Sequence, residues 1–297
     1  MNILRYRQSE TNSAISLLVV SSVLWGSGFV AVKIGLSYLN PFLFAFIRMG
    51  VAGVIQLGVL ISLGGLRRKT LKEKSVWALG LFNAMGFTIQ FVGMQFTTAA
   101  KTALLVDMNV VFVALLSKRF SNESFGKRKQ LGVALGIVGA VMITTNGNLS
   151  TLTQGQLLGD ALVFSSGLIW AGFMVLHKYE QTKHEWNAVE LSALVMLLTA
   201  VLLTPGAILF GGLNAAPITQ VGWEWVAYTA IATTVVPYAM WIVALRAVTA
   251  TIAAIVGMVE IVTAMILSSL LLGETYGAVT LAGAGLVLLS LMAVADI

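Results

Sequence analysis

The chain has 297 residues, of which 58% are hydrophobic and 10% are charged, and its mean hydropathy of +0.91 excludes an ordinary soluble domain. The net charge is +6 at pH 7, but the basic residues are scattered without an aromatic-studded basic face, so nucleic acid is not an expected partner. Cysteine is absent, which excludes a disulfide framework, a thiolate metal site and a cysteine nucleophile.

Ten apolar stretches follow one another along the chain, each long enough, at about twenty residues, to cross a ~30 Å hydrocarbon core as a helix. They cover residues 14–36, 41–63, 75–96, 99–117, 130–146, 157–177, 188–210, 223–244, 248–271 and 278–295. The first stretch is too long for a signal peptide and lacks a small-x-small cleavage site, so we expect an uncleaved span. The sequence thus predicts an all-α membrane protein with ten transmembrane helices.

Basic residues occupy only alternate connections between these stretches. Fifteen of the eighteen lie before the first span or in the second, fourth, sixth and eighth connections: Arg5, Arg7, Arg67, Arg68, Lys69, Lys72, Lys74, Lys118, Arg119, Lys127, Arg128, Lys129, Lys178, Lys183 and Arg246. The connections at 147–156, 211–222 and 272–277 contain none. By the positive-inside rule, this pattern predicts that both termini are cytoplasmic.

Two motif pairs indicate an internal repeat. Residues 24–33 align without gaps with residues 169–178, and residues 115–132 align in the same way with residues 266–283. We therefore predict two five-helix repeats.

The first repeat covers 14–146 and the second covers 157–295. Because each holds an odd number of spans, the second must be inverted relative to the first. Inverted repeats about a pseudo-twofold axis in the membrane plane are a transporter architecture, with the substrate site near the midplane.

These residues resemble the drug/metabolite transporter superfamily, and within it the ten-helix EamA-type permeases. The matching parts are the Trp-Gly-x-x-Phe-x-x-x-Lys run at 25–33, the Asn40-Pro41 turn, Arg48, and the hairpins that bear Glu123, Glu260 and Glu274. The resemblance covers residues 14–293. It implies efflux or exchange of small metabolites such as amino acids across a bacterial or archaeal cell (inner) membrane. One departure is that the family often has proline in spans four and nine, where this chain has Val110 and Ile261.

Small residues recur within several spans. The run from Gly26 to Ala31 matches a dinucleotide-binding fingerprint, but it lies inside a span with no preceding strand, so we interpret it as close helix packing. Spans five and ten contain further small residues at close spacing: Gly132, Gly136, Gly139, Ala278, Ala282 and Gly283. We expect these two spans to pack against partners rather than to line a cavity.

Five ionisable residues lie within spans, where each needs a partner or water. Lys33 and Lys101, near span ends, either snorkel to the interface or face a partner. Arg48 either fixes the fold through carbonyls or a helix end, or contacts substrate. Asp107 and Glu260 are candidate proton carriers, with structural carboxylates as the alternative.

Glu260 has a neutral counterpart in the first repeat. At the offset that matches Glu123 to Glu274, its equivalent is Asn109. We therefore hypothesise that Glu260 makes transport pH-sensitive; a structural pairing with Arg48 or Lys101 is the alternative.

Polar and aromatic side chains at membrane depth are candidates to line a substrate cavity: Trp25, Asn83, Gln90, Met94, Asn109, Trp170, Tyr238 and Trp241. Asn83 and Gln90 are seven residues apart and share one face of span three. The aromatic residues have an alternative place in an interfacial belt.

We predict a secondary transporter of a small molecule, with the lipid bilayer as its surroundings, as a monomer or homodimer. The sequence has no nucleophile–base set and no phosphate loop, and its two histidines are unclustered, so no catalytic activity, cofactor or metal is expected. The alternatives are an intramembrane enzyme and a non-transporting scaffold subunit.

Overall fold

The computed structural model of the protein describes residues 2–62, 72–120, 126–148, 156–183, 187–210, 217–244 and 256–294. Every regular element in these ranges is a helix. The first half contains α1 (Asn2–Gly35), α2 (Pro41–Ser62), α3 (Lys74–Met94), α4 (Ala99–Val106), α5 (Asn109–Phe120) and α6 (Lys127–Thr145). The second half contains α7 (Gln156–Lys183), α8 (Ala188–Leu209), α9 (Gln220–Ala230), the π-helix η3 (Ile231–Val235), α10 (Val236–Ala244), α12 (Val259–Leu272) and α13 (Ala278–Val294).

These helices follow the predicted spans. Within the described ranges, α1, α2, α3, α7 and α8 each contain a segment long and apolar enough to cross a membrane unaided. The fourth span is divided into α4 and α5, and the eighth into α9, η3 and α10. The ninth span begins outside the described residues and continues as α12.

Local sequence signals set several helix ends. Thr98 caps α4 by accepting from the Lys101 amide at 3.2 Å, and Asn187 caps α8 by accepting from the Val189 amide at 3.0 Å. At the end of α12, Gly273 adopts φ 66°, a left-handed conformation that favours glycine. Pro41 begins α2, where its missing amide hydrogen removes no helical bond.

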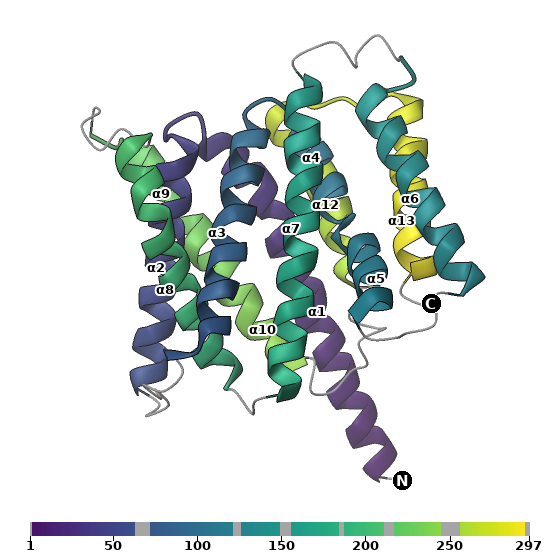
Figure 1. The fold of residues 1–297 in the computed structure, drawn as a ribbon. Coiled ribbons are helices and arrows are strands. Elements are labelled where there is room, and N and C mark those ends of the chain that lie inside the picture. Colours follow the sequence, from purple (N-terminus) through teal and green to yellow (C-terminus); the bar gives the residue numbers. More distant parts are fainter. Residues whose placement is uncertain are drawn as a thin grey trace.

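The two halves pack in pairs that a twofold rotation exchanges. α3 packs on α7, and the counterpart contact joins α9 and α10 to α1. α4 and α5 pack on α7 as α12 packs on α1, and α3 packs on α8 as α9 packs on α2. In two pairs the rotation exchanges one helix with the other. These are α2 with α8 and α6 with α13, which lie at opposite edges of the bundle (Figure 1). The fold is therefore two inverted five-helix repeats around a pseudo-twofold axis.

The predicted packing of spans five and ten is confirmed. A Cβ atom added at Gly139 of α6 would lie 2.8 Å from the Gly283 carbonyl oxygen of α13, and one added at Gly283 would lie 2.9 Å from the Gly139 carbonyl oxygen. Backbone meets backbone at this contact, so only glycine fits on either side.

The fingerprint-like run of span one is also a packing motif. A Cβ atom at Gly26 would overlap the Glu260 carbonyl oxygen of α12, and one at Gly28 would lie 3.1 Å from the Thr233 side chain. α1 thus lies against both α12 and η3, which the prediction of close helix packing anticipated.

The fourth and ninth spans are interrupted at equivalent places. Asp107 and Met108 form the turn between α4 and α5, and Met258 forms the turn before α12. The offset that relates Asn109 to Glu260 also relates Asp107 to Met258. Neither interruption contains proline, and Val110 and Ile261 occupy the positions where the resemblance implies one.

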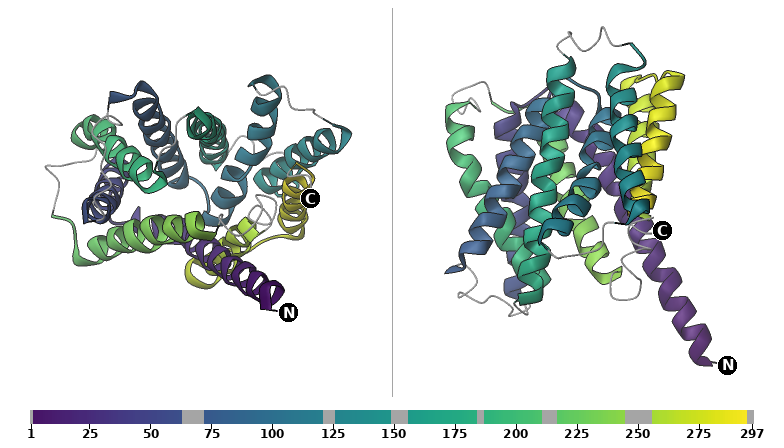
Figure 2. Two further views of the ribbon diagram at one scale, coloured as in Figure 1. Left: turned by 90° about the horizontal axis from the view of Figure 1, so that it is seen from below. Right: turned by 45° about the vertical axis from the view of Figure 1, so that its right-hand side comes forward.

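The amino-terminal end of α1 and the carboxyl-terminal end of α13 lie toward the same end of the bundle, which is the lower end in Figure 1 and in the right view of Figure 2. The connection from α12 to α13 lies at the opposite end, with the start of α4. An even number of spans requires this arrangement.

Candidate substrate site between the two halves

Arg48 of α2 lies at the interface between the two halves and is 7% exposed. Its Nε donates to Thr234 Oγ1 at 3.1 Å, and its Nη2 donates to the same oxygen at 3.0 Å and to Thr233 Oγ1 at 3.3 Å. The rings of Phe87 and Phe91 lie 5.2 and 5.7 Å from the guanidinium carbon. No carboxylate in the described ranges forms an ion pair with Arg48, so hydroxyls and aromatic rings hold this cation.

The two threonines belong to η3, a single π-helical turn in span eight. Both hydroxyls donate to the Thr229 carbonyl oxygen, at 2.9 Å from Thr233 and 2.8 Å from Thr234. Pro237 has no amide hydrogen to donate to the Thr233 carbonyl, which is the physical reason for a widened turn here. The extra residue in the turn presents two adjacent hydroxyls to Arg48.

Phe87 and Trp170 form an aromatic wall that extends from Arg48 to α7. The Phe87 ring lies edge-on to Trp170, with centroids 4.8 Å apart, and Trp170 Nε1 donates to Gln90 Oε1 at 3.0 Å. Gly86 makes room for this indole, because a Cβ atom there would lie 3.0 Å from its ring. Gln90 and Trp170, two predicted site residues, therefore meet at the α3–α7 interface.

A second aromatic pair joins α1 to α10. The rings of Trp25 and Trp241 have centroids 5.0 Å apart, at an interplanar angle of 49°. Tyr238 lies one turn earlier on α10. By the pseudo-twofold rotation, the α1–α10 pair is the counterpart of the α3–α7 wall.

Two other predicted site residues take part in packing. Asn83 is 2% exposed and donates to Thr199 Oγ1 of α8 at 2.9 Å. Met94 is fully buried in the core. Asn83 thus contacts α8 and Gln90 contacts α7, so the face of α3 that they share lies against both helices.

The interrupted spans carry the remaining candidates. Asn109 begins α5, and Glu260 lies in the first turn of α12, so both occupy amino-terminal helix ends at membrane depth. Asn109 is 7% exposed, and its Oδ1 has no hydrogen-bond partner among the described residues. Asp107 lies in the turn between α4 and α5. Each interrupted span therefore carries one carboxyl at its interruption.

The two lysines bind elsewhere, at the end of the bundle opposite the termini. Lys33 donates to the carbonyl oxygens of Met94 and Thr97, at the end of α3. Lys101 forms an ion pair with Asp160 of α7 at 3.1 Å, and Thr97 donates to the same carboxylate. Neither lysine pairs with Asp107 or Glu260 in the described structure, nor does Arg48.

Sequence reasoning missed Asp160, Thr233 and Thr234 as partners of the spanning cations. Asp160 offered a signal, because it is an acidic residue four positions into an apolar stretch. The two threonines offered a weaker one: they are adjacent hydroxyls shortly before a proline inside a span. Glu123, predicted to lie at the end of span four, falls outside the described residues.

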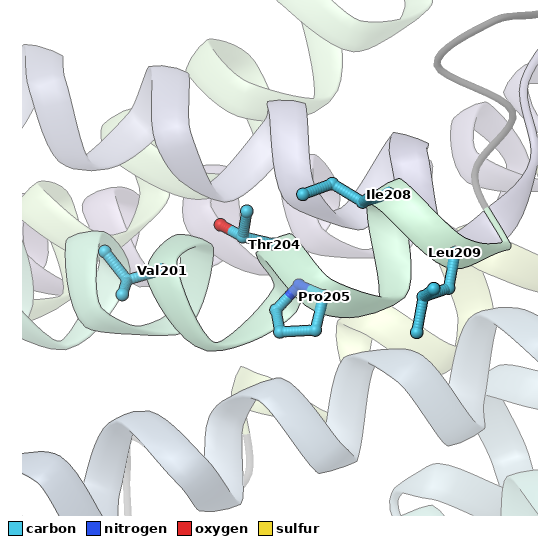
Figure 3. Close-up of a pocket in the computed structure, with 5 residues that line it drawn as sticks. All are labelled: Val201, Thr204, Pro205, Ile208 and Leu209. Carbon is cyan, nitrogen blue, oxygen red and sulfur yellow. The ribbon is translucent and has the colours of Figure 1, made fainter.

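Surface grooves lie away from these groups. One is lined by Val201, Thr204, Pro205, Ile208 and Leu209, all on α8 (Figure 3). Another lies between α3 and α8 and is apolar. Neither contains a predicted site residue. Both are lined almost wholly by apolar side chains, so these are grooves that lipid chains would fill.

Comparison with known proteins identifies the family. The sequence profile of the EamA-like transporter family matches the chain twice, at residues 12–145 and 157–295. An uncharacterized transporter of Archaeoglobus fulgidus is 30% identical over 234 residues, which cover 77% of this chain and 78% of that protein. The uncharacterized transporter YyaM of Bacillus subtilis is 25% identical, with 76% and 75% covered.

The fold has a counterpart among solved structures. One, titled only as the crystal structure of a protein, superimposes with a TM-score of 0.67 at 17% identity and covers 95% of each chain. With the duplicated profile match, the chain belongs to the EamA-like transporter family, and it is an integral membrane protein of the drug/metabolite transporter superfamily.

Proposed function

We propose that this protein is a secondary transporter that moves a small amphipathic metabolite, such as an amino acid, by alternating access. The observation that carries the proposal is the pseudo-twofold interface between the halves, where Arg48 donates to Thr234 and Trp170 donates to Gln90. If the contacts at one end of the interface break while their symmetry counterparts at the other end form, one midplane site opens to each side of the membrane in turn. Export is the direction proposed, from the family resemblance.

The interface has the chemistry that such a solute needs. Arg48, Gln90 and Asn109 offer polar contacts, and Trp170 and Phe87 offer aromatic surface. A solute with one charged group and an apolar body fits this combination better than an ion or a sugar does. A catalytic role would require a convergent nucleophile and base, which these residues do not provide.

Orientation belongs to the same proposal. The basic residues in alternate connections support cytoplasmic termini in a bacterial or archaeal inner membrane. A reporter that is active only outside the cytoplasm should be silent when fused after Ile297 and active when inserted within 147–156. The reverse pattern would overturn this topology.

Reconstitution tests the function. Purified protein in liposomes preloaded with unlabelled amino acid should accelerate uptake of the same labelled compound over protein-free vesicles. Counterflow of one or more of the twenty amino acids is the expected result. Chemical conversion of the solute without flux would favour an intramembrane enzyme, and neither flux nor conversion would favour a scaffold subunit.

A further inference from the structure

The hydrogen bonds of Arg48 show how its guanidinium is occupied. Nε and Nη2 lie side by side and donate in parallel, which is the geometry that a carboxylate accepts with two oxygens. Here one hydroxyl, Thr234 Oγ1, accepts from both atoms, at 3.1 and 3.0 Å. A neutral group therefore occupies the edge of the cation to which an anion binds best.

The charge balance around Arg48 favours an anion. The side chain is 7% exposed at membrane depth, and no carboxylate in the described ranges pairs with it. Phe87 and Phe91 offset part of its desolvation through their ring faces. Hydrogen bonds from a cation to a carboxylate are about twice as strong as those between neutral groups, so an anion would displace the hydroxyl.

The segment that holds Thr234 is suited to this exchange. Thr233 and Thr234 lie on a single π-helical turn between α9 and α10, and such turns are frequent at functional sites. The hydroxyl of Thr234 keeps its bond to the Thr229 carbonyl oxygen at 2.8 Å without help from Arg48. Thr234 can therefore leave the guanidinium without losing its own acceptor.

The wall beside Arg48 determines what the rest of the ligand must be. Phe87 contacts both the Arg48 guanidinium and Trp170, and the centroids of the Phe87 and Trp170 rings are 4.8 Å apart. An apolar or aromatic body attached to the anionic group would lie along this wall. Gln90, which accepts from Trp170, adds one amide at its end.

We propose that Arg48 binds the carboxylate of the transported solute and that this carboxylate takes the place of the Thr234 hydroxyl. The proposal rests on the proposed transport function and narrows its substrate class to small carboxylates with an apolar body. Arg48, rather than the surface grooves on α8, determines whether a solute is accepted.

Binding to the purified full-length protein tests this directly, apart from flux. The probes are amino acids, 2-oxo acids and aromatic acids, each paired with its own amide, and thermal stabilisation gives their affinities. We expect one or more acids to bind at least about tenfold more tightly than their amides, as a charge-assisted bond requires. Arg48→Gln should remove that preference, and Arg48→Lys should keep part of it.

Thr234→Val provides a second test that does not depend on whether Arg48 variants fold. Removing the competing hydroxyl should tighten binding of the acid several-fold while lowering the stability of the ligand-free protein. A purely structural Arg48 would give the loss of stability alone. Thr204→Val, which removes a similar hydroxyl on the α8 surface, is the matched control and should leave binding unchanged.

Several results would overturn the proposal. These are equal binding of acids and amides, no acid-specific stabilisation across the panel, or an acid preference that survives Arg48→Gln. Sodium chloride and sodium phosphate are measured as well. If either stabilises the protein as much as the acids do, and Arg48→Gln abolishes that effect, the ligand of Arg48 is an inorganic ion. Counterflow that is indifferent to the carboxylate would leave transport intact and defeat this inference alone. Acid binding without flux would leave the carboxylate site at Arg48 intact and defeat the proposed transport function alone.

Discussion

The Glu274 carboxylate of the second half accepts a hydrogen bond from the Ala99 amide of the first half at 2.7 Å, and one from the Ala100 amide at 3.3 Å. It therefore caps the amino-terminal end of α4, where the helix dipole favours negative charge. Burial raises the pKa of Tyr276 to about 12, so its hydroxyl stays protonated at neutral pH and donates to Glu274 at 3.2 Å. This contact joins the two halves at the end opposite the termini.

Glu274→Gln should loosen that end of the bundle. The substitution removes the charge but keeps the shape, and we expect about 1 kcal/mol lower stability, the usual value of such a cap. Thr97→Cys places a single cysteine in this cysteine-free chain. That cysteine should react faster with a water-soluble thiol reagent in the Glu274→Gln background than in the background that keeps Glu274. Glu224→Gln, at an exposed acidic residue of α9, is the control. Equal labelling rates in both backgrounds would show that Glu274 does not hold this end closed.

The buried ion pair between Lys101 and Asp160 should be costly to break from one side. The two side chains are 14% and 1% exposed, so Asp160→Asn leaves a cation with a neutral partner and should lower stability by about 3–5 kcal/mol. The double variant Lys101→Met/Asp160→Asn should recover part of that loss in thermal unfolding. Additive losses from the two single variants would mean that the residues act independently.

The contact between α6 and α13 should tolerate no side chain. In Gly139→Val the new Cβ would meet the Gly283 carbonyl oxygen at 2.8 Å, and backbone cannot move aside as a flexible side chain can. We expect a loss of at least about 1–3 kcal/mol, or failure to fold. Gly285→Val on α13 is the control, because a Cβ atom there meets nothing within 4 Å. Similar melting temperatures for both variants would contradict the packing.

Glu260 should make transport depend on pH. Glu260 lies in the first turn of α12, where the ninth span is interrupted at membrane depth, so uptake of a proton by its carboxylate changes the charge at this interruption and should alter the balance between conformations. Glu260→Gln keeps the size and hydrogen bonding of the side chain but removes its charge, and it should flatten the flux–pH profile in proteoliposomes. If a folded Glu260→Gln protein keeps the wild-type profile, Glu260 is structural and Asp107→Asn becomes the variant to measure.

The sequence predicted the helical membrane fold, the two repeats and the close packing of spans five and ten against partners, because hydropathy, loop charge and small-residue spacing report directly on the bilayer. It did not predict the division of span four at Asp107. The family proline is missing there, and an apolar stretch looks the same whether its helix is continuous or broken. The sequence did not predict the partners of the basic side chains within the spans. That Lys101 meets Asp160 and Arg48 meets Thr234 depends on how distant helices pack, which periodicity within one span does not contain.

Locking the halves together tests the central claim of alternating access most directly. A Cβ atom at Gly159 of α7 would lie 2.8 Å from the Phe96 Cβ of the first half, within about 1 Å of disulfide geometry. In the double variant Phe96→Cys/Gly159→Cys, oxidation should reduce counterflow to the level of protein-free liposomes, and reduction should restore the level that this variant had before oxidation. Oxidation should leave counterflow by the single variant Phe96→Cys unchanged. Wild-type counterflow by protein that is shown to be fully cross-linked would contradict the account.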